Sequence, residues 1–195
     1  MKEFKSFYKT VGGNEGDKCR YNTRLDLYGC GCSHDCAYCY AKSLLNFRGL
    51  WNPAEPAVAD LAKVEKRIAK LKPGTIVRLG GMTDCFQPME AQEKATLRAV
   101  ELLNRYGIGY LIVTKSDLVC DYRHVLDKSL AHIQISTTWI PAEKAVSTER
   151  RIRAIETLQA EGFDVAVRLS PYVPQFVDFD RLNSIQCDKI IVEFL

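Results

Sequence analysis

The sequence lacks a long hydrophobic run. No apolar stretch approaches the roughly 20 residues that a membrane-spanning helix requires. The first twenty residues, MKEFKSFYKTVGGNEGDKCR, alternate charged and polar residues and lack the apolar stretch of a signal peptide. We therefore expect a cytoplasmic protein without membrane contact. Because thiols stay reduced in the cytosol, the eight cysteines favour metal or redox chemistry over a disulfide framework.

The chain also has little excess of charge of either sign. Its formal net charge is +3, and the basic residues in 63–72 and 149–153 are interleaved with acidic or apolar residues at helical spacing. This spacing is typical of solvated helix faces. The charge neither excludes nor supports a nucleic-acid substrate.

Repeats and low-complexity tracts are absent as well, and 195 residues suffice for one domain with a sizeable core. From residue 24 onward, short apolar strands alternate with amphipathic helices. We expect strands at 24–29, 75–81, 110–116, 132–139, 163–173 and 189–195. We expect helices at 57–71, 89–107, near 118–130, from the N-cap Ser147 to Gly162, and near 178–184. Residues 1–23 are expected to form an N-terminal segment that packs on a core domain of residues 24–195.

Six strands separated by helices predict an α/β fold with a parallel sheet. In such sheets the functional residues gather at the carboxyl ends of the strands. Unusual residues follow the predicted strands here: the cysteines, then Gly80 to Asp84, Thr114 to Ser116, Ser136 to Thr138, and Ser170 to Tyr172. Their convergence at one edge of the sheet predicts a ligand site there.

Four of the cysteines lie within the stretch GCGCSHDCAYCYAK. Cys32, Cys36 and Cys39 have the spacing C-x3-C-x2-C, and Cys30 is an additional thiol. A structural zinc site needs four ligands, and Cys30 or His34 would complete it. An electron-transfer Fe–S cluster also needs four cysteines, whereas a catalytic cluster uses three and leaves one iron open. The spacing alone leaves these three kinds of site open.

The cysteine spacing, with Tyr38 before the third cysteine and after the first strand of a parallel (βα) repeat, resembles the radical S-adenosylmethionine (SAM) enzymes. More narrowly, GCSHDCAYCYA, GGMTDCFQPME, TKS and RRIRAIETLQAEGFDVAVRLSPYVP are similar to the spore photoproduct lyase-like branch of that superfamily. The resemblance covers residues 23–195. It implies a partial (β/α)6 TIM-like barrel of parallel strands, of the radical SAM type.

The resemblance implies that Cys32, Cys36 and Cys39 hold a 4Fe–4S cluster whose open iron binds SAM. Reductive cleavage of SAM would release a 5′-deoxyadenosyl radical, which removes a hydrogen atom from an unidentified substrate. A low-potential electron donor such as flavodoxin or ferredoxin is implied as a partner. The family spacing gives Cys30 no role, and the reaction class, lyase or oxidoreductase, stays unassigned.

The resemblance also implies contacts to SAM at the other strand ends. Thr83 and Asp84 would meet its amino group, Lys115 its carboxylate through a charge-assisted bond, and Ser136 the same methionine moiety. The competing interpretations are strand or turn capping for Thr83 and Ser136, and a solvated loop lysine for Lys115.

Four further residues are candidates for the same cofactor. Gly80 and Gly81 let the backbone approach a ligand closely. Tyr38 would place its backbone near adenine, or else pack as an ordinary tyrosine. Arg168 would reach the ribose, with a salt bridge inside the barrel as the competing interpretation.

The chain departs from the lyase pattern at one informative position. The lyase has a hydrogen-donating cysteine where this chain has Met82, and a thioether has no S–H to donate. Cys85 lies three residues later and is a candidate for the hydrogen relay, although it also suits a buried core position. Tyr40 matches a tyrosine of the lyase relay, with core packing as the competing interpretation. The segment WIPAEKAVSTERR is also shorter and less proline-rich than the family pattern. Because of both departures, we do not expect repair of thymine dimers.

The last predicted strand is followed by no helix that would cover it. We expect that a partner or a second copy covers this strand, or that the chain is a short version of a larger fold. The alternative to a radical enzyme is a non-catalytic Fe–S or zinc protein that serves electron transfer or stabilises a partner.

Overall fold

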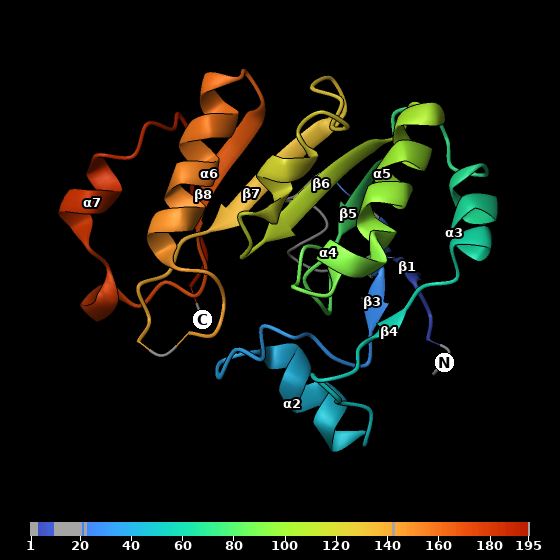
Figure 1. Ribbon diagram of the computed structural model, residues 1–195, viewed down its shortest axis with the longest axis horizontal. Helices are drawn as coiled ribbons and strands as arrows, with labels where there is room; N and C mark the ends of the chain where they lie inside the picture. The colour runs from blue at the N-terminus through green and yellow to red at the C-terminus, as the bar shows by residue number, and fades with distance from the viewer. Residues whose placement is uncertain (1–3, 10–20, 22, 142, 195) are drawn as a thin grey trace.

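The computed structural model describes residues 4–9, 21, 23–141 and 143–194, and Figure 1 shows the arrangement of their helices and strands. The strands are β1 (Phe7–Lys9), β2 (Thr23–Leu25), β3 (Tyr28–Gly29), β4 (Ala57–Val58), β5 (Ile76–Leu79), β6 (Gly109–Thr114), β7 (Ala131–Ser136), β8 (Asp164–Leu169) and β9 (Ile190–Val192). The helices are α2 (Tyr40–Phe47), α3 (Leu61–Ile68), α4 (Glu90–Glu93), α5 (Ala95–Arg105), α6 (Thr148–Ala160) and α7 (Phe179–Asn183), with 3-10 turns η1 (Leu118–Tyr122) and η2 (Pro174–Phe176).

Seven strands form one sheet in the order β1-β2-β5-β6-β7-β8-β9. The pairs from β2 to β9 are parallel, and β1 is antiparallel to β2. The prediction of a mostly parallel α/β sheet is therefore confirmed. Because β1 and β9 are the two edges of this sheet, its strands do not close into a barrel.

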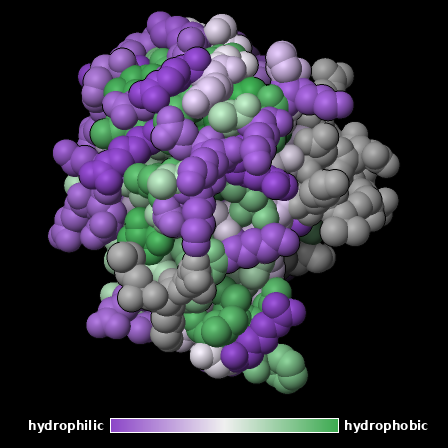
Figure 2. All heavy atoms as spheres, turned by 90° about the vertical axis from the view of Figure 1, so that its right-hand side faces the viewer, coloured by the Kyte–Doolittle hydropathy of each residue, from purple (hydrophilic) through white to green (hydrophobic). Residues whose placement is uncertain are grey.

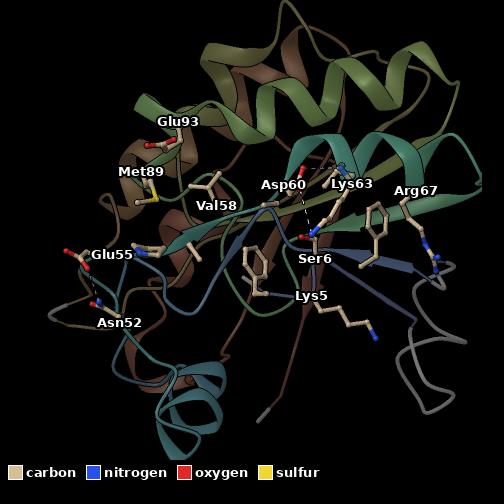
Figure 3. Close-up of a pocket in the computed structure, with 16 residues that line it drawn as sticks. Lys5, Ser6, Asn52, Glu55, Val58, Asp60, Lys63, Arg67, Met89 and Glu93 are labelled. Atoms are coloured by element: carbon tan, nitrogen blue, oxygen red, sulfur yellow. Dashed lines mark hydrogen bonds and ion pairs between the residues drawn. The ribbon is translucent and has the colours of Figure 1, made fainter. Parts of the chain in front are cut away.

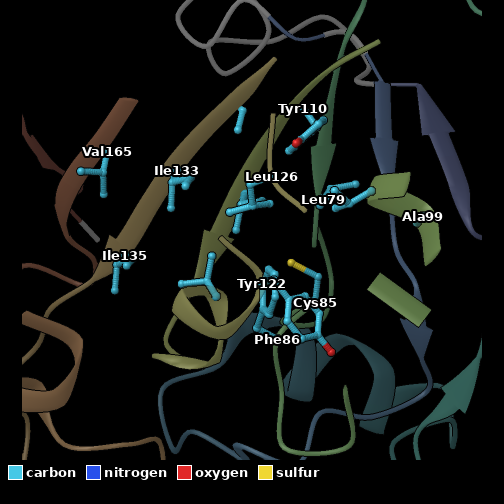
Figure 4. Packing of buried hydrophobic residues seen from close by; sticks show 14 of the residues in the cluster. Leu79, Cys85, Phe86, Ala99, Tyr110, Tyr122, Leu126, Ile133, Ile135 and Val165 are labelled. Atoms are coloured by element: carbon cyan, nitrogen blue, oxygen red, sulfur yellow. The ribbon is translucent and has the colours of Figure 1, made fainter. Parts of the chain in front are cut away.

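One face of the sheet carries the hydrophobic core. Leu79, Ile112, Ile133 and Val167 are 0–1% exposed, and their strand register places them on the same face. Helices α5 and α6 cover this face (Figure 1), and Figure 4 shows the packing of Leu79, Ile133, Ile135 and Val165 with Phe86 and Tyr122. Every crossover advances the sheet by one neighbouring strand in the same direction, so successive helices fall on one side.

The opposite face of the sheet is polar. Arg24 on β2 is the register partner of Arg78 on β5. Arg168 on β8 donates to Gln134 Oε1 at 2.7 Å and forms an ion pair with Glu193 at 2.6 Å. This ion pair agrees with the competing interpretation of Arg168, and its contact with the ribose stays a prediction. This face cannot serve as a second hydrophobic core.

Some helices begin at the residue that the sequence predicted, and others do not. Ser147 caps α6 by accepting from Arg150 N, as predicted. The predicted helix 57–71 begins only at Leu61, where Asp60 accepts from the first backbone N–H groups. Residues 57–58 form β4 instead, because they pair with β3.

The predicted helix 89–107 is interrupted at Lys94, which has a φ of 52°. Glu90, fully buried, accepts from Thr96 N at 2.8 Å and Leu97 N at 3.0 Å, and Tyr28 donates to the same carboxylate. The Glu90 carboxylate thus caps the first turn of α5. The turn at Lys94 between α4 and α5 brings Glu90 to that position.

The region near 118–130, predicted as a helix, contains the short turn η1 and no α-helix. The last strand, β9, has exposed side chains as expected, with Ile190 51% exposed. Among the described residues, no helix is long and apolar enough to cross a lipid bilayer. Most of the predicted N-terminal segment, residues 1–3, 10–20 and 22, lies outside the described residues.

Replacement of Ile133 by Ala should lower the free energy of unfolding by about 2–5 kcal/mol, because it removes buried methyl groups and leaves a cavity under α6. The matched control is Ile190→Ala on the exposed strand β9, which should cost less than about 1 kcal/mol. Urea unfolding followed by circular dichroism measures both. Equal losses would show that the core does not lie where these strands place it.

Candidate functional site

The cysteine loop, residues 30–39, connects β3 to α2. Two tight turns shape it, with Asp35 N donating to Cys32 O at 3.0 Å and Cys39 N donating to Cys36 O at 3.2 Å. Cys30 and Asp35 have positive φ angles of 57° and 42°, and among the described non-glycine residues only Lys94 shares this conformation. Such backbone costs free energy and persists only where surrounding contacts hold it.

The loop packs closely against the segment after α2. Asn52 N donates to Cys30 O at 2.7 Å, and a Cβ at Gly31 would lie 2.0 Å from Asn52 O. Only glycine fits at position 31, since any side chain would push these two segments apart.

The three cysteines with C-x3-C-x2-C spacing sit at the inner side of this loop. Cys32 and Cys36 are both 8% exposed, and Cys39 is partly exposed. Burial raises the pKa of the Cys32 thiol to about 12, although hydrogen bonds from the backbone of Asp84 and His34 oppose this. Burial likewise raises the pKa of Cys36 to about 11, and the nearby Lys115 ammonium opposes it. Both thiols are therefore protonated at neutral pH in the free protein, and metal binding would release these protons.

Asp84, at the end of the turn after β5, ties the cysteine loop to the sheet. Its Oδ1 accepts from Phe86 N at 2.8 Å and Thr114 Oγ1 at 2.7 Å, while Oδ2 accepts from Lys115 N at 2.7 Å and lies 3.3 Å from His34 Nε2. Burial alone would raise the pKa of Asp84, but the contacts with His34, Lys115 and Thr114 outweigh it and hold the pKa below its ordinary value. The carboxylate therefore stays charged.

A second polar residue after β5 holds the same loop. Gln87, fully buried, accepts from Ser33 N at 2.8 Å and from Ser33 Oγ at 3.0 Å. On the outer side, Asp35 pairs with Lys42 at 2.8 Å and Lys144 at 2.7 Å. The loop is thus attached to three other segments of the chain.

Glu143 is a site residue that the sequence did not reveal. Arg151 NH2 lies 2.5 Å from its Oε2, Thr138 donates to it at 2.8 Å, and Tyr38 of the cysteine loop donates to its other oxygen. Lys115 Nζ lies 3.5 Å from Oε1. Burial raises the pKa of Glu143, and Arg151 opposes this. Glu143 therefore joins the cysteine loop to the ends of β6 and β7 and to α6.

Lys115 is a largely enclosed cation, with 16% of its side chain exposed. Its Nζ lies 3.0 Å from Ser170 O and 5.2 Å from the centre of the Tyr38 ring. Burial lowers the pKa of Lys115 to about 8. The ammonium lies where the ends of β6 and β8 meet the cysteine loop, as the predicted convergence of strand ends requires.

The other predicted residues at the strand ends serve the scaffold in this structure. Thr83 donates to Tyr28 O at 2.6 Å, and Ser136 O accepts from Arg151. Gly80 has a φ of 79°, and a Cβ there would meet Thr83 O at 2.7 Å, so this turn itself requires glycine. Gly81 N donates to Asp26 Oδ1 at 2.6 Å.

The two hydrogen-relay candidates lie in different surroundings. Tyr40 donates to Gly81 O, and its ring is largely exposed beside the site. Cys85 is 1% exposed and packs within the hydrophobic core, where Figure 4 shows it beside Phe86. The core position matches the competing interpretation of Cys85 as a small buried apolar residue.

Among the described residues, no three His, Cys, Asp or Glu side chains are grouped to hold one metal ion. A 4Fe–4S cluster makes a different demand, because each cysteine binds a different iron and the sulfur atoms are spread around it. His34 Nδ1, Gln87 Nε2 and Thr137 Oγ1 are buried without hydrogen-bond partners at this end of the sheet. These atoms are therefore free to form hydrogen bonds with a bound group.

A cavity of about 1150 Å³ reaches Asn52, which packs against the cysteine loop. It is bounded by the segment 4–7, by β4 and by α3 (Figure 3). Lys5 and Arg67 lie toward one end of it and Glu55 and Glu93 toward the other, as the labelled side chains show. None of the three spaced cysteines lines it.

Comparison with known proteins identifies a distant relative. The chain is 25% identical over 166 residues to an uncharacterized protein of Methanocaldococcus jannaschii, and the match covers 78% of this chain and 61% of the relative. The chain therefore spans less than two thirds of the length of that relative. No family model and no solved structure matches the sequence.

Replacement of Glu143 by Gln should lower the free energy of unfolding by about 3 kcal/mol, because it leaves the buried Arg151 without a carboxylate partner. Glu149→Gln is the matched control, since Glu149 forms an exposed pair with Arg181 and should cost less than about 1 kcal/mol. Urea unfolding of both variants measures the difference. If both variants lost a similar amount of unfolding free energy, Glu143 would not be the buried partner of Arg151.

Lys115 should make stability depend on pH. Because its folded-state pKa of about 8 lies below the ordinary 10.5, the unfolded chain binds more protons between these values, and stability should rise with pH across this window. The rise should amount to at most about 3 kcal/mol. Lys115→Met should remove it, so the difference in unfolding free energy between wild type and variant, measured from neutral to alkaline pH, isolates this contribution. If the difference between wild type and variant did not change with pH, the Lys115 ammonium would be exposed to solvent.

Proposed function

We propose that this chain is a radical SAM enzyme of the spore photoproduct lyase-like branch. Cys32, Cys36 and Cys39 would hold a 4Fe–4S cluster, and S-adenosylmethionine would bind beside it at the ends of the parallel strands. The substrate from which a hydrogen atom is removed is unidentified. The sheet order, which advances by one strand at each crossover, supports a partial (β/α)6 barrel as the finer description of the fold.

The observation that carries this proposal is the attachment of the cysteine loop to three successive strand ends. Asp84 after β5 contacts His34, Lys115 after β6 lies over the ring of Tyr38, and Glu143 after β7 accepts from the same tyrosine. The spaced thiols therefore lie at the edge where parallel sheets bind ligands.

When bound, the cluster and SAM supply the reductive cleavage that yields a 5′-deoxyadenosyl radical. The protein binds, orients and shields these groups. The burial of Cys32 and Cys36 would shield a bound cluster from water, and the backbone N–H groups directed at Cys32 would stabilise its thiolate as a ligand. Such surroundings suit a reactive species that water must not reach.

Lys115 supplies a buried positive charge suited to a carboxylate such as that of SAM. Asp84 already accepts hydrogen bonds from Thr114 and Lys115, and Thr83 already donates one to Tyr28 O. Their role is therefore to position the loop and the strand ends. Tyr40, with its exposed ring beside Gly81, is the better placed of the two hydrogen-relay candidates.

Anaerobic reconstitution with iron and sulfide, followed by reduction with dithionite, should give the electron paramagnetic resonance signal of a reduced 4Fe–4S cluster. Addition of SAM should change this signal, because SAM would bind the iron that lacks a cysteine. Chromatography should then detect 5′-deoxyadenosine. Cys36→Ala should bind much less iron and form no 5′-deoxyadenosine.

Cys187→Ala is the control, because Cys187 lies near the start of β9, far along the chain from the loop, and should leave the signal intact. A cluster signal that SAM does not change would instead indicate the non-catalytic Fe–S protein. Bound zinc without iron would indicate a structural site. SAM cleavage by the Cys36→Ala variant at the wild-type rate would contradict the ligand assignment.

A further inference from the structure

Arg24 on the polar face of the sheet has a buried nitrogen without an acceptor. The residue lies on β2, and its side chain points away from the core, because the next residue, Leu25, is fully buried on the other face. Arg24 Nε is buried and has no hydrogen-bond partner among the residues that the structure describes. An unpaired buried donor costs free energy. An acceptor from outside the chain would remove this cost.

Asp26, two residues further along, offers an open acceptor on the same face. It is 2% exposed, and its Oδ1 accepts from Gly81 N at 2.6 Å and from Met82 N at 3.0 Å. Its Oδ2 is buried and has no partner within the described part of the chain. Burial raises the pKa of Asp26, and its backbone hydrogen bonds and the charge of Arg24 oppose this. Arg24 and Asp26 thus lie near each other, and each keeps one unused polar atom.

Gly81 lies between these two side chains. A Cβ at Gly81 would lie 3.0 Å from Arg24 Cδ and 3.5 Å from Asp26 Oδ2. Tyr40 donates to Gly81 O from a third direction. We call Arg24, Asp26 and Tyr40, which surround Gly81, the Gly81 site. Because Tyr40 follows Cys39 directly, a group bound at the Gly81 site would lie beside the cysteine loop.

A second arginine stands next to the Gly81 site. Arg78 on β5 is the register partner of Arg24 on β2, so the two side chains leave neighbouring strands on the same face. Arg78 donates to the Tyr21 hydroxyl at 2.7 Å, which holds its guanidinium in place. Burial raises the pKa of the Tyr40 hydroxyl, and the charges of Arg78 and Arg24 oppose this. Like charges on neighbouring strands repel each other, so an anion beside them would be stabilising.

We propose that the Gly81 site binds the substrate through one anionic group, a carboxylate or a phosphate, that has a hydroxyl group next to it. The planar guanidinium of Arg24 donates to the anion, whose geometry it matches. Asp26 Oδ2 accepts from the hydroxyl group. The substrate class is therefore hydroxylated organic acids or phosphate esters. This inference rests on the proposed function, because the radical would form at the adjoining strand ends, and it adds the class of substrate.

The cavity shown in Figure 3 is the rival anion site, because Lys5 and Arg67 give it one basic end. Neither Arg24 nor Asp26 lines that cavity. Arg67 belongs to α3, and Figure 2 shows hydrophilic side chains across much of the side of the molecule that carries this helix. Arg67 is exposed there. Its substitution is therefore the matched control for Arg24.

Isothermal titration with phosphate, acetate and glycolate as probes tests the Gly81 site. The reconstituted protein is titrated at constant ionic strength with SAM present, so that SAM rather than the probe would fill the open iron. Arg24→Gln should weaken binding of the anions by about tenfold or more, because it removes charge-assisted hydrogen bonds. Arg67→Gln should bind as wild type does. Arg24→Lys keeps the charge but loses the planar fork, so its affinity should lie between the two.

Acetate and glycolate separate the two halves of the site. Glycolate has the hydroxyl group that acetate lacks, so wild type should bind it about fivefold more tightly. Asp26→Asn can still accept from Gly81 N and Met82 N, but it puts an amide donor where Oδ2 would accept. This variant should lose the preference for glycolate and still bind acetate. Tighter binding of phosphate than of glycolate would indicate a phosphate ester, and the reverse a hydroxy acid.

Urea unfolding shows whether Arg24 has a purely structural role. Arg24→Gln should unfold at the wild-type urea concentration, because Arg24 Nε has no partner to lose. A variant that is destabilised but binds the anions as wild type does would overturn the Gly81 site. Wild type that binds none of the three probes, or an equal weakening by Arg67→Gln, would overturn it as well. Anion binding that depends on Arg24, in a protein that does not cleave SAM with dithionite, would overturn the proposed function alone.

Discussion

The buried carboxylate of Asp84 sets the geometry of the strand-end site. A charge removed from water must receive hydrogen bonds at both oxygens, or the folded state loses several kilocalories per mole. The donors here come from the turn after β5 and from the end of β6, and His34 of the cysteine loop lies 3.3 Å from the same carboxylate. A shift of any one of these segments would leave the carboxylate without a partner. Their relative positions are therefore fixed together.

Glu143 repeats this arrangement on the other side of the loop. It connects Tyr38 to Arg151, whose guanidinium in turn donates to Ser136 O at the end of β7. Because two carboxylates hold the loop from two directions, the backbone at Cys30 and Asp35 can keep an unfavourable left-handed conformation. Protein contacts alone thus hold the loop that carries the three spaced thiols in this conformation, so a bound group would not have to order the loop itself.

The sequence predicted those parts of the structure whose signals are local. The β-branched run at 75–81, the cap Ser147 and the cysteine spacing each lie within a few residues. Helix α2, whose eight residues follow directly on the cysteine loop, was not predicted. The hydrogen bond between Tyr38 and Glu143 joins residues 105 apart, and nothing near Glu143 in the sequence signals it. The break between α4 and α5 was also missed, because Glu90 caps the second helix with a side chain that periodicity does not describe.

The consecutive strand order has a consequence for how this chain reaches its fold. From β5 to β9, each strand pairs with the strand that precedes it in the sequence, so each new (βα) unit needs only the edge left by the unit before it. Contacts of this kind close modest loops and keep the entropic barrier to folding low. A ribosome releases the chain in this same order, from β5 toward β9. The sheet is therefore suited to stepwise assembly during synthesis, one strand at a time.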